Sequence, residues 1–252
     1  PHRYSPPSTA ANTTHITTLT YRHSTSDDSE IKTVLRHADY TRDLWGVAPR
    51  LPSGTTVITD NTAINRTRQA RGGHEETWTS QTDYTRKFDT GPLRHETLVG
   101  LELLQERAGR WTYGAGVAAT PATTVGAPNA SPALPAGYGS QVRSAINRYQ
   151  GLTTGIYAQD TVEFLPGWKV LLGLRHDRMD AQYSNGAEVE FGEWSYRTGL
   201  SWQPTELQHY YLAFSDSFNP TADLYQFTTT TTPAPADRSK TLELGAKREP
   251  FE

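Results

Sequence analysis

The chain has 252 residues, a formal net charge of -3, a hydrophobic content of 35% and a mean hydropathy of -0.65. These values are low for a soluble domain that must bury a core, and they are less unusual for a sheet whose second face lines water. The absence of Cys excludes disulfides and thiolate metal sites. No apolar stretch approaches the roughly 20 residues of a membrane helix, so any membrane role must be carried by strands.

Period-two patterning predicts strands along most of the chain, because successive side chains of a strand point to opposite faces of its sheet. Two long polar connections, 43–75 and 108–151, interrupt the series, and the second contains a possible helical turn at 144–150. The strands are expected at about 13–23, 30–42, 76–88, 94–107, 152–165, 169–179, 193–203, 209–218 and 239–248.

The alternation is clearest at 193–203, where large apolar and aromatic residues share one face and small or polar residues share the other. The expected apolar face there carries Trp194, Tyr196, Thr198, Leu200 and Trp202. A soluble β-sandwich shows the same alternation, with its apolar face turned toward a second sheet. Alternation alone therefore leaves both architectures open.

Connection length and strand length favour a membrane barrel. Short connections at 24–29, 89–93, 165–167 and 204–207 alternate with long ones at 43–75, 108–151, 181–192 and 219–237. Outer-membrane barrels have short turns at one end and long loops at the other, and their strands need about 9–11 residues to cross the bilayer. The sequence thus predicts an all-β fold, an antiparallel up-and-down transmembrane β-barrel segment of about nine strands that is incomplete.

Several motifs then indicate a family. They are the G-x-Y-x-Q-D strand at 155–160, a turn with Trp168, the L-G-L-R-x-D strand at 172–177, Gln203 to Thr205, Ser215 to Pro220, and E-x-G-x-K at 243–247. As a set they resemble the TonB-dependent siderophore receptors, and 30–51 and 95–113 resemble the barrels of the catecholate-type group.

The resemblance implies a bacterial outer-membrane barrel of about 22 strands with a plug in its lumen. On that comparison residues 1–252 are one part of the barrel, and the plug domain and the C-terminal strand are absent. The lack of an initiator Met and the abrupt end at Glu252 lead us to expect an excerpt of a longer protein.

The implied function is energy-coupled uptake of a ferric siderophore. The implied partners are a ferric siderophore of catecholate type, the TonB energy-coupling complex acting through the missing plug, and outer-membrane lipid. We expect no nucleic-acid partner, no catalytic constellation, no metal site and no directly bound cofactor, the ferric siderophore being the transported ligand. A passive porin-type channel and a soluble β-sandwich binding module remain the alternatives.

Three arginines in the first long connection, Arg66, Arg68 and Arg71, are candidate ligand contacts. Guanidinium groups suit an oxygen-rich anion, such as the ferric catecholate that the resemblance implies, through charge-assisted hydrogen bonds and stacking. Solvated arginines, or pairing with acidic lipopolysaccharide at the rim, explain the same residues. Five loop aromatics are further candidates because binding residues concentrate in loops, although they can equally pack the loops together: Trp45, Trp111, Tyr113, Tyr138 and Tyr149.

Other side chains have simpler assignments. Aromatics near the expected strand ends are typical of the interfacial girdles of barrels: Trp78, Trp194, Trp202, Tyr196, Tyr210 and Phe218. His74, Glu75 and Glu76 read as a solvated edge, since neighbours on a strand point to opposite faces. Asp160 falls on the apolar face with Ile156 and Val162, and the sequence does not explain it.

Overall fold

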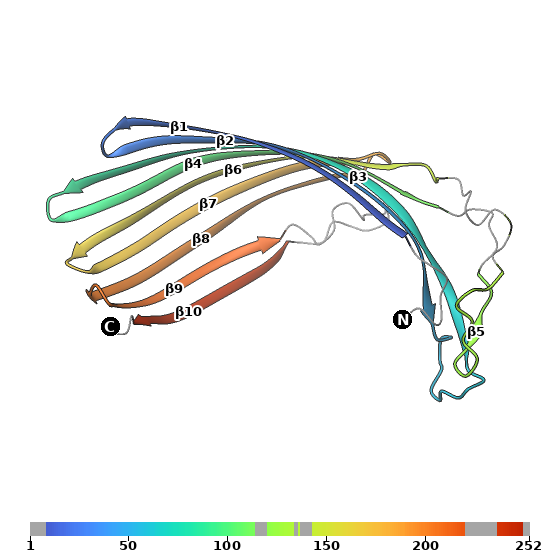
Figure 1. Cartoon of the computed structure of the whole chain (residues 1–252). Helices are drawn as coiled ribbons and strands as arrows, with labels where there is room; N and C mark the ends of the chain where they lie inside the picture. The colour runs from blue at the N-terminus through green and yellow to red at the C-terminus, as the bar shows by residue number, and fades with distance from the viewer. Residues whose placement is uncertain (1–8, 114–119, 134–135, 137–142, 220–235, 249–252) are drawn as a thin grey trace. The chain divides into compact units, whose positions relative to one another are not determined.

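The computed structural model describes residues 9–113, 120–133, 136, 143–219 and 236–248, and within these ranges every regular element is a strand (Figure 1). A search of these residues finds no helix long and apolar enough to cross a membrane. The strands are β1 (Thr9–Ser26), β2 (Ser29–Arg50), β3 (Ala63–Thr90), β4 (Leu93–Thr112), β5 (Thr123–Thr124), β6 (Asn147–Leu165), β7 (Trp168–Tyr183), β8 (Glu188–Thr205), β9 (Gln208–Asn219) and β10 (Asp237–Arg248).

The strands form one up-and-down sheet in the order β1-β2-β3-β4-β6-β7-β8-β9-β10, with β5 paired to β3 outside this path. The consecutive strands from β6 to β10 pair antiparallel. Among the described residues β1 and β10 are the two edges, so the sheet is not closed. The predicted all-β, antiparallel and incomplete barrel segment is confirmed, and within the described ranges no second sheet packs on it as a sandwich requires.

The strands are longer than predicted, and this corrects three connections. Much of 43–75 belongs to β2 and β3, and β3 alone has 28 residues. The connection at 181–192 shrinks to 184–187, because β7 and β8 pair as far as Gln182 and Glu188. The helical turn at 144–150 is wrong, since β6 begins at Asn147. These extensions are polar, and polar strands pair as well as apolar ones when their backbone groups have partners.

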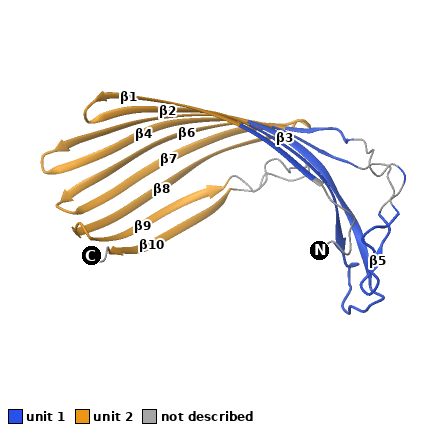
Figure 2. Cartoon of the chain, in the orientation of Figure 1, with its two compact units in different colours: residues 1–15, 39–76, 108–148 blue, residues 16–38, 77–107, 149–252 orange. Residues whose placement is uncertain are grey.

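By its internal contacts the chain divides into two compact units (Figure 2). Unit 1 comprises residues 1–15, 39–76 and 108–148, and unit 2 comprises residues 16–38, 77–107 and 149–252. The two longest connections expected from the sequence, 43–75 and 108–151, belong almost wholly to unit 1, whereas most of the strands with clean alternation belong to unit 2.

The apolar face of unit 2 runs unbroken across the strands. Val170 lies opposite Leu200, Leu200 opposite Leu212, and Leu212 opposite Leu244. Leu200, Leu212 and Leu244 are 40%, 45% and 82% exposed, so no part of the described protein covers this row. A large exposed apolar surface indicates a membrane or partner contact.

Aromatic rings border that face at two levels, as predicted. Near the short turns, the Trp168 and Trp202 rings stack at 5.3 Å, and the Trp202 and Tyr210 rings stack at 5.5 Å. Toward the other end of β8, Trp194 contacts His176 with their ring centroids 4.6 Å apart. Such paired girdles are typical of the two interfaces of a membrane barrel.

A glycine fixes the turn between β6 and β7. Gly167 has a φ of 76°, in the left-handed region that favours glycine, and a Cβ there would lie 2.4 Å from the Gln203 carbonyl oxygen. The Gln203 backbone N–H donates to the Gly167 carbonyl at 2.8 Å. The turn is thus tied to the end of β8, which holds Trp168 beside Trp202.

Candidate functional site

Three of the predicted loop aromatics come together in unit 1. Trp45 comes from β2, Trp111 from β4, and Tyr113 follows β4 in an isolated bridge with Arg143. The Trp45 and Tyr113 rings meet edge to face, with centroids 5.9 Å apart and planes at 70°. With Asp43 and Arg143 these residues form a group that we call the aromatic–arginine cluster.

Arg143 is held in this cluster by two rings and a hydroxyl. Its Cζ lies 4.5 Å from the centroid of the Trp111 ring and 5.8 Å from that of Tyr113, and its Nε donates to the Tyr113 hydroxyl at 3.1 Å. That hydroxyl donates in turn to Asp43 Oδ2 at 3.0 Å. Only Nε is used, so the remaining guanidinium N–H groups of this exposed residue have no partner among the described residues.

Two buried polar atoms beside Arg143 also lack partners in the described protein. Trp111 is 6% exposed, and its indole Nε1 makes no hydrogen bond. Oδ1 of Asp43 is likewise buried and unbonded, although Oδ2 accepts from Tyr113. Buried polar groups in native proteins are nearly always satisfied, so each such exception calls for an explanation, such as a role in binding. Here a free donor and a free acceptor flank a preorganised cation.

The strand below Trp111 is shaped for it. Gly72 on β3 lies under the indole, and a Cβ at this position would be 2.4 Å from Trp111 Nε1. Glycine therefore allows the ring to lie against the strand backbone, a use of glycine for close approach. The flat indole is the surface on which the Arg143 guanidinium rests.

The chemistry of the cluster suits a planar, electron-rich anion. A guanidinium backed by aromatic rings donates hydrogen bonds in a fixed plane and is weakly hydrated, so it binds delocalised oxyanions and stacks on further rings. The described part of the chain contains no group of three His, Asp or Glu residues able to hold a metal ion. His74 instead contacts Asp39, at 2.8 Å.

Arg66 is buried, and its guanidinium contacts the backbone of a neighbouring segment. It is 5% exposed, and its guanidinium donates to the backbone carbonyls of Pro121, at 2.6 Å, and of Asn129. It thereby fastens residues 121–129 to β3, where Thr123 pairs with Ile64. Direct ligand contact by Arg66 stays a prediction, and its observed contacts are structural.

Three of the other predicted residues, Arg68, Arg71 and Tyr149, belong to the described part of the chain. Arg68 is half-buried and Arg71 is exposed on β3. Tyr149 belongs to unit 2, is 4% exposed, and packs against Tyr183 with ring centroids 5.4 Å apart. Tyr138 lies outside the described residues.

Asp43 and Arg143 were not predicted from the sequence. The sequence could have indicated Asp43 as a site residue, because it stands two residues before Trp45 and therefore on the same face of an extended chain. Arg143 had none, since it lies in a connection dense in Ala, Pro and Gly whose path the sequence does not define.

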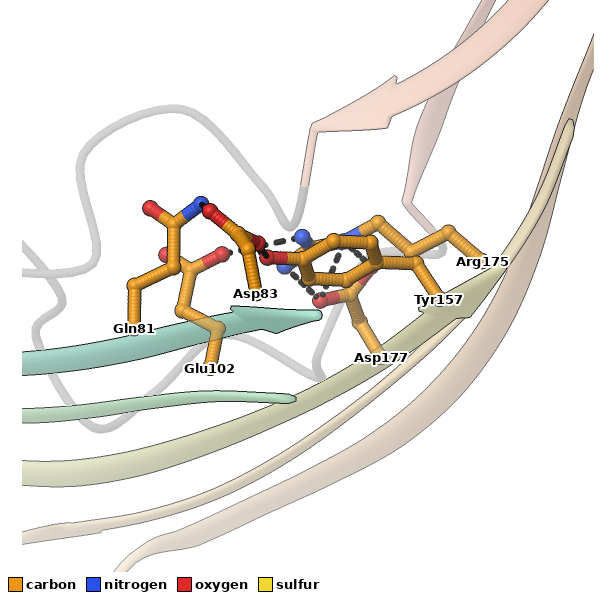
Figure 3. A network of polar contacts seen from close by, with 6 residues as sticks. All are labelled: Gln81, Asp83, Glu102, Tyr157, Arg175 and Asp177. Carbon is orange, nitrogen blue, oxygen red and sulfur yellow. Dashed lines mark hydrogen bonds and ion pairs between the residues drawn. The ribbon is translucent and has the colours of Figure 1, made fainter. Parts of the chain in front are cut away.

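Unit 2 holds a second polar group, on the face opposite to the apolar one (Figure 3). Tyr157 on β6 donates to Asp83 on β3, and Gln81 donates to the Tyr157 hydroxyl at 3.0 Å. Arg175 on β7 lies 5.2 Å above the Tyr157 ring and pairs with two carboxylates, Glu102 of β4 at 2.9 Å and Asp177 at 2.6 Å.

This network, which we call the wall network, joins four strands, and the charge of Arg175 is paired with carboxylates of the network itself. Tyr157 lies flat over Gly100 of β4, where a Cβ would be 2.2 Å from the ring. Arg175 bonds to Asp177 on its own strand and to Glu102 on β4, on the far side of β6. Such packing stiffens the sheet, so we assign the wall network to structure and the aromatic–arginine cluster to binding.

A family model described as "TonB dependent receptor-like, beta-barrel" matches residues 1–252. Among curated proteins, the chain is 24% identical over 233 residues to the probable TonB-dependent siderophore receptor PiuA of Acinetobacter baumannii, covering 82% of this chain and 30% of PiuA. It is 26% identical over 180 residues to the catecholate siderophore receptor Fiu of Escherichia coli K12, covering 69% of this chain and 23% of Fiu. The chain thus spans less than a third of these relatives.

Solved structures agree on the fold. The crystal structure of the ferric-catecholate import receptor Fiu from E. coli K12 in its closed form matches with a TM-score of 0.81 at 18% identity, over 98% of this chain and 39% of that chain. The siderophore receptor PiuA from A. baumannii matches with a TM-score of 0.77 at 20% identity, over 98% of this chain and 39% of that chain.

Proposed function

Because the chain belongs to the TonB dependent receptor-like β-barrel family, a family of bacterial outer-membrane proteins, we propose that the protein imports a ferric siderophore across the outer membrane. The observation that carries this proposal is the aromatic–arginine cluster in unit 1, which offers a stacked cation and unsatisfied polar atoms. The two relatives support it, since Fiu is a catecholate siderophore receptor and PiuA is a probable TonB-dependent siderophore receptor.

We assign the first step, capture of the ligand, to this cluster. A ferric catecholate presents planar aromatic rings and anionic oxygens. The guanidinium of Arg143 is suited to both, because it can hydrogen-bond to the oxygens while it stacks on a ring. Asp43 holds Tyr113, and through it Arg143, in place.

The second step, passage through the barrel, needs energy that binding does not supply. We propose that it depends on a TonB complex acting through a plug, as the family name implies. This step separates the proposal from a passive porin-type channel, which conducts its solutes without energy.

Uptake of radiolabelled iron tests the proposal. Cells that carry the native protein as their one siderophore receptor are given ferric catecholate, hydroxamate or carboxylate chelates. We expect accumulation of the catecholate complex, and its loss when a protonophore dissipates the proton-motive force. Accumulation that continues under the protonophore would identify a passive channel, and preference for another chelate would overturn the ligand class.

Arg143→Gln tests the assignment of the site within the same assay. Glutamine keeps hydrogen-bonding capacity but loses the charge and most of the stacking, so we expect binding of the ferric catecholate to weaken about tenfold. Arg178→Gln is the matched control, because Arg178 is an exposed arginine of unit 2 already paired with Asp180 and Glu190. Equal affinity for both variants would remove Arg143 from the site.

A further inference from the structure

The apolar face of unit 2 contains a hydrogen-bonded polar cluster that accounts for Asp160. His95 Nδ1 lies 2.7 Å from Asp160 Oδ2, and the Thr97 hydroxyl donates to Asp160 Oδ1 at 3.0 Å. The Thr90 hydroxyl lies 2.6 Å from His95 Nε2. Asp160 stands directly opposite Leu172, whose side chain is 56% exposed on this face. The carboxylate therefore faces outward with both of its oxygens engaged by neighbouring side chains.

This cluster lies beside the turn between β3 and β4, at the end of the sheet with the short turns. In outer-membrane barrels the short turns face the periplasm. His95 is two residues into β4, and Phe88 is two residues before the end of β3. The cluster thus stands near the periplasmic interface of the lipid-facing surface, where phospholipid headgroups meet the barrel.

A stack of side chains connects the cluster to an outward-facing arginine. The Phe88 ring stacks on the His95 ring, with centroids 4.7 Å apart and an interplanar angle of 5°. On β3, Arg86 shares the outward face with Phe88, and its Cζ lies 5.8 Å from the Phe88 ring. The side chain therefore bends toward the strand end, as arginines do when they extend toward an interface.

The charge of Arg86 is not neutralised within the described protein. Its one interaction there is with the Phe88 ring, and no described carboxylate pairs with it. Asp160 is the nearby anion of the cluster, and its oxygens are taken by His95 and Thr97. An exposed guanidinium on a lipid-facing surface needs an anion, and the anion that the membrane offers is a phosphate.

Apolar side chains continue the outward face from this point toward the middle of the membrane. Val99, Leu101 and Leu103 of β4 follow Thr97 at every second position and are 49%, 44% and 41% exposed. A phosphate at Arg86 would place acyl chains along this row. The arrangement therefore has a polar end and an apolar track in the order that a phospholipid requires.

We propose that Arg86, supported by the Phe88–His95 stack, binds the phosphate of a phospholipid in the periplasmic leaflet of the outer membrane. The Asp160 cluster keeps His95 and Phe88 oriented, and the β4 row accommodates the acyl chains. The site is independent of the aromatic–arginine cluster and of siderophore uptake. A protein partner is the less favoured occupant, because the cationic end is one side chain wide and continues into an aliphatic row.

Native mass spectrometry of the detergent-purified native protein tests this site. The probes are phosphatidylglycerol and a diacylglycerol with the same acyl chains, which lacks the phosphate. We expect retention of phosphatidylglycerol over diacylglycerol, and about tenfold weaker retention in Arg86→Gln. Arg178→Gln, which changes an outward arginine already paired with Asp180 and Glu190, should retain the lipid as the unaltered protein does.

Three outcomes of this experiment would contradict the phospholipid site. Equal retention in Arg86→Gln would overturn the proposal, and equal binding of diacylglycerol would assign the interaction to acyl chains alone. Displacement by millimolar inorganic phosphate would identify a free-phosphate site instead of a lipid site. If Arg86→Gln fails to assemble, Phe88→Leu serves in its place, with an expected loss of about threefold because it removes the ring that positions the guanidinium. Siderophore uptake is not a readout, so the two proposals fail separately.

Discussion

The two units differ in what their side chains leave unsatisfied. In unit 2 the faces follow the sequence alternation, and Arg175 pairs with Asp177 on its own strand and with Glu102 on β4. In unit 1 the buried polar atoms of Trp111 and Asp43 have no described partner, and Arg143 keeps donors free. The polar face of unit 2 is thus complete by itself, whereas the cluster of unit 1 is suited to completion by a ligand.

The difference reflects the surroundings of each unit. Lipid on one side and a polar interior on the other impose a strict period of two, and each uncompensated charge on the lipid side is costly. Chain in which neither face is apolar has no such constraint, so its side chains can be placed for binding. A polar atom without a partner is a defect in the first setting and a contact point in the second.

The largest expected effect comes from reversing the apolar face of unit 2. Leu200→Arg places a cation in the middle of the row formed by Val170, Leu212 and Leu244. An arginine at the bilayer midplane costs about 2–4 kcal/mol in a barrel, so we expect a marked loss of heat-resistant, membrane-assembled protein.

Ala213→Arg is the control for this change. Ala213 follows Leu212 and therefore points to the opposite face, where it lies opposite Glu243. The same cation should be tolerated there. Normal assembly of Leu200→Arg, or equal failure of both variants, would refute the assignment of the two faces.

A smaller loss is expected from the wall network. Arg175→Met leaves Glu102 and the buried Asp177 without their shared cation, and an unsatisfied buried polar group costs about 1–3 kcal/mol. We expect a lower midpoint of thermal unfolding for the assembled protein, with ferric-chelate affinity unchanged. Arg178→Met, on the same strand but in an exposed pair, should leave the midpoint where it was. A changed affinity in Arg175→Met would move the wall network into the binding machinery.

The sequence predicted unit 2 far better than unit 1, for the same physical reason. Alternation in 193–203 and 209–218 located the strands, the lipid face and most girdle residues, because the membrane enforces that pattern. In unit 1, β2 and β3 pair through polar residues whose sequence pattern is typical of a loop. The sequence therefore could not predict that 43–50 and 63–75 are strand.

The sequence predicted the aromatic residues of the candidate site but not its arginine. Aromatic residues in long connections pointed to Trp45, Trp111 and Tyr113, but their meeting with Arg143 depends on a bridge that no local pattern encodes. Arg66 shows the opposite case. Its residue type suggested an anion site, yet its partners are backbone carbonyls 55 and 63 residues away, which composition cannot reveal.

Arg66 allows the structural and binding roles within unit 1 to be separated. Arg66→Met removes the donors to Pro121 and Asn129, and we expect local opening of 121–129 at a cost of about 1–3 kcal/mol. Hydrogen exchange should become faster in that segment and stay unchanged in unit 2. Chelate affinity should fall less than in Arg143→Gln. An affinity loss without faster exchange would restore Arg66 as a ligand contact.

The smallest expected change in stability, and the sharpest test of the cluster, comes from one added methyl group. Gly72→Ala puts a Cβ 2.4 Å from Trp111 Nε1, so the indole must tilt away from β3 and carry the Arg143 platform with it. Displacement of the buried ring by one added methyl group should cost about 1 kcal/mol, the lower end of the range for overpacking. Affinity for the ferric catecholate should nevertheless fall as it does in Arg143→Gln, because stacking depends on ring orientation.

Gly73→Ala is the neighbouring control. A Cβ there lies 3.3 Å from the Gly109 carbonyl oxygen and meets no part of the cluster. Titration of both variants with the ferric catecholate, followed by tryptophan fluorescence, distinguishes the two positions. If both bind as the unaltered protein does, the ligand does not rest on the indole. The unsatisfied atoms of unit 1 would then need a partner other than the ferric catecholate. The contrast between the satisfied polar face of unit 2 and a ligand-binding unit 1 would no longer hold, because it depends most on Trp111.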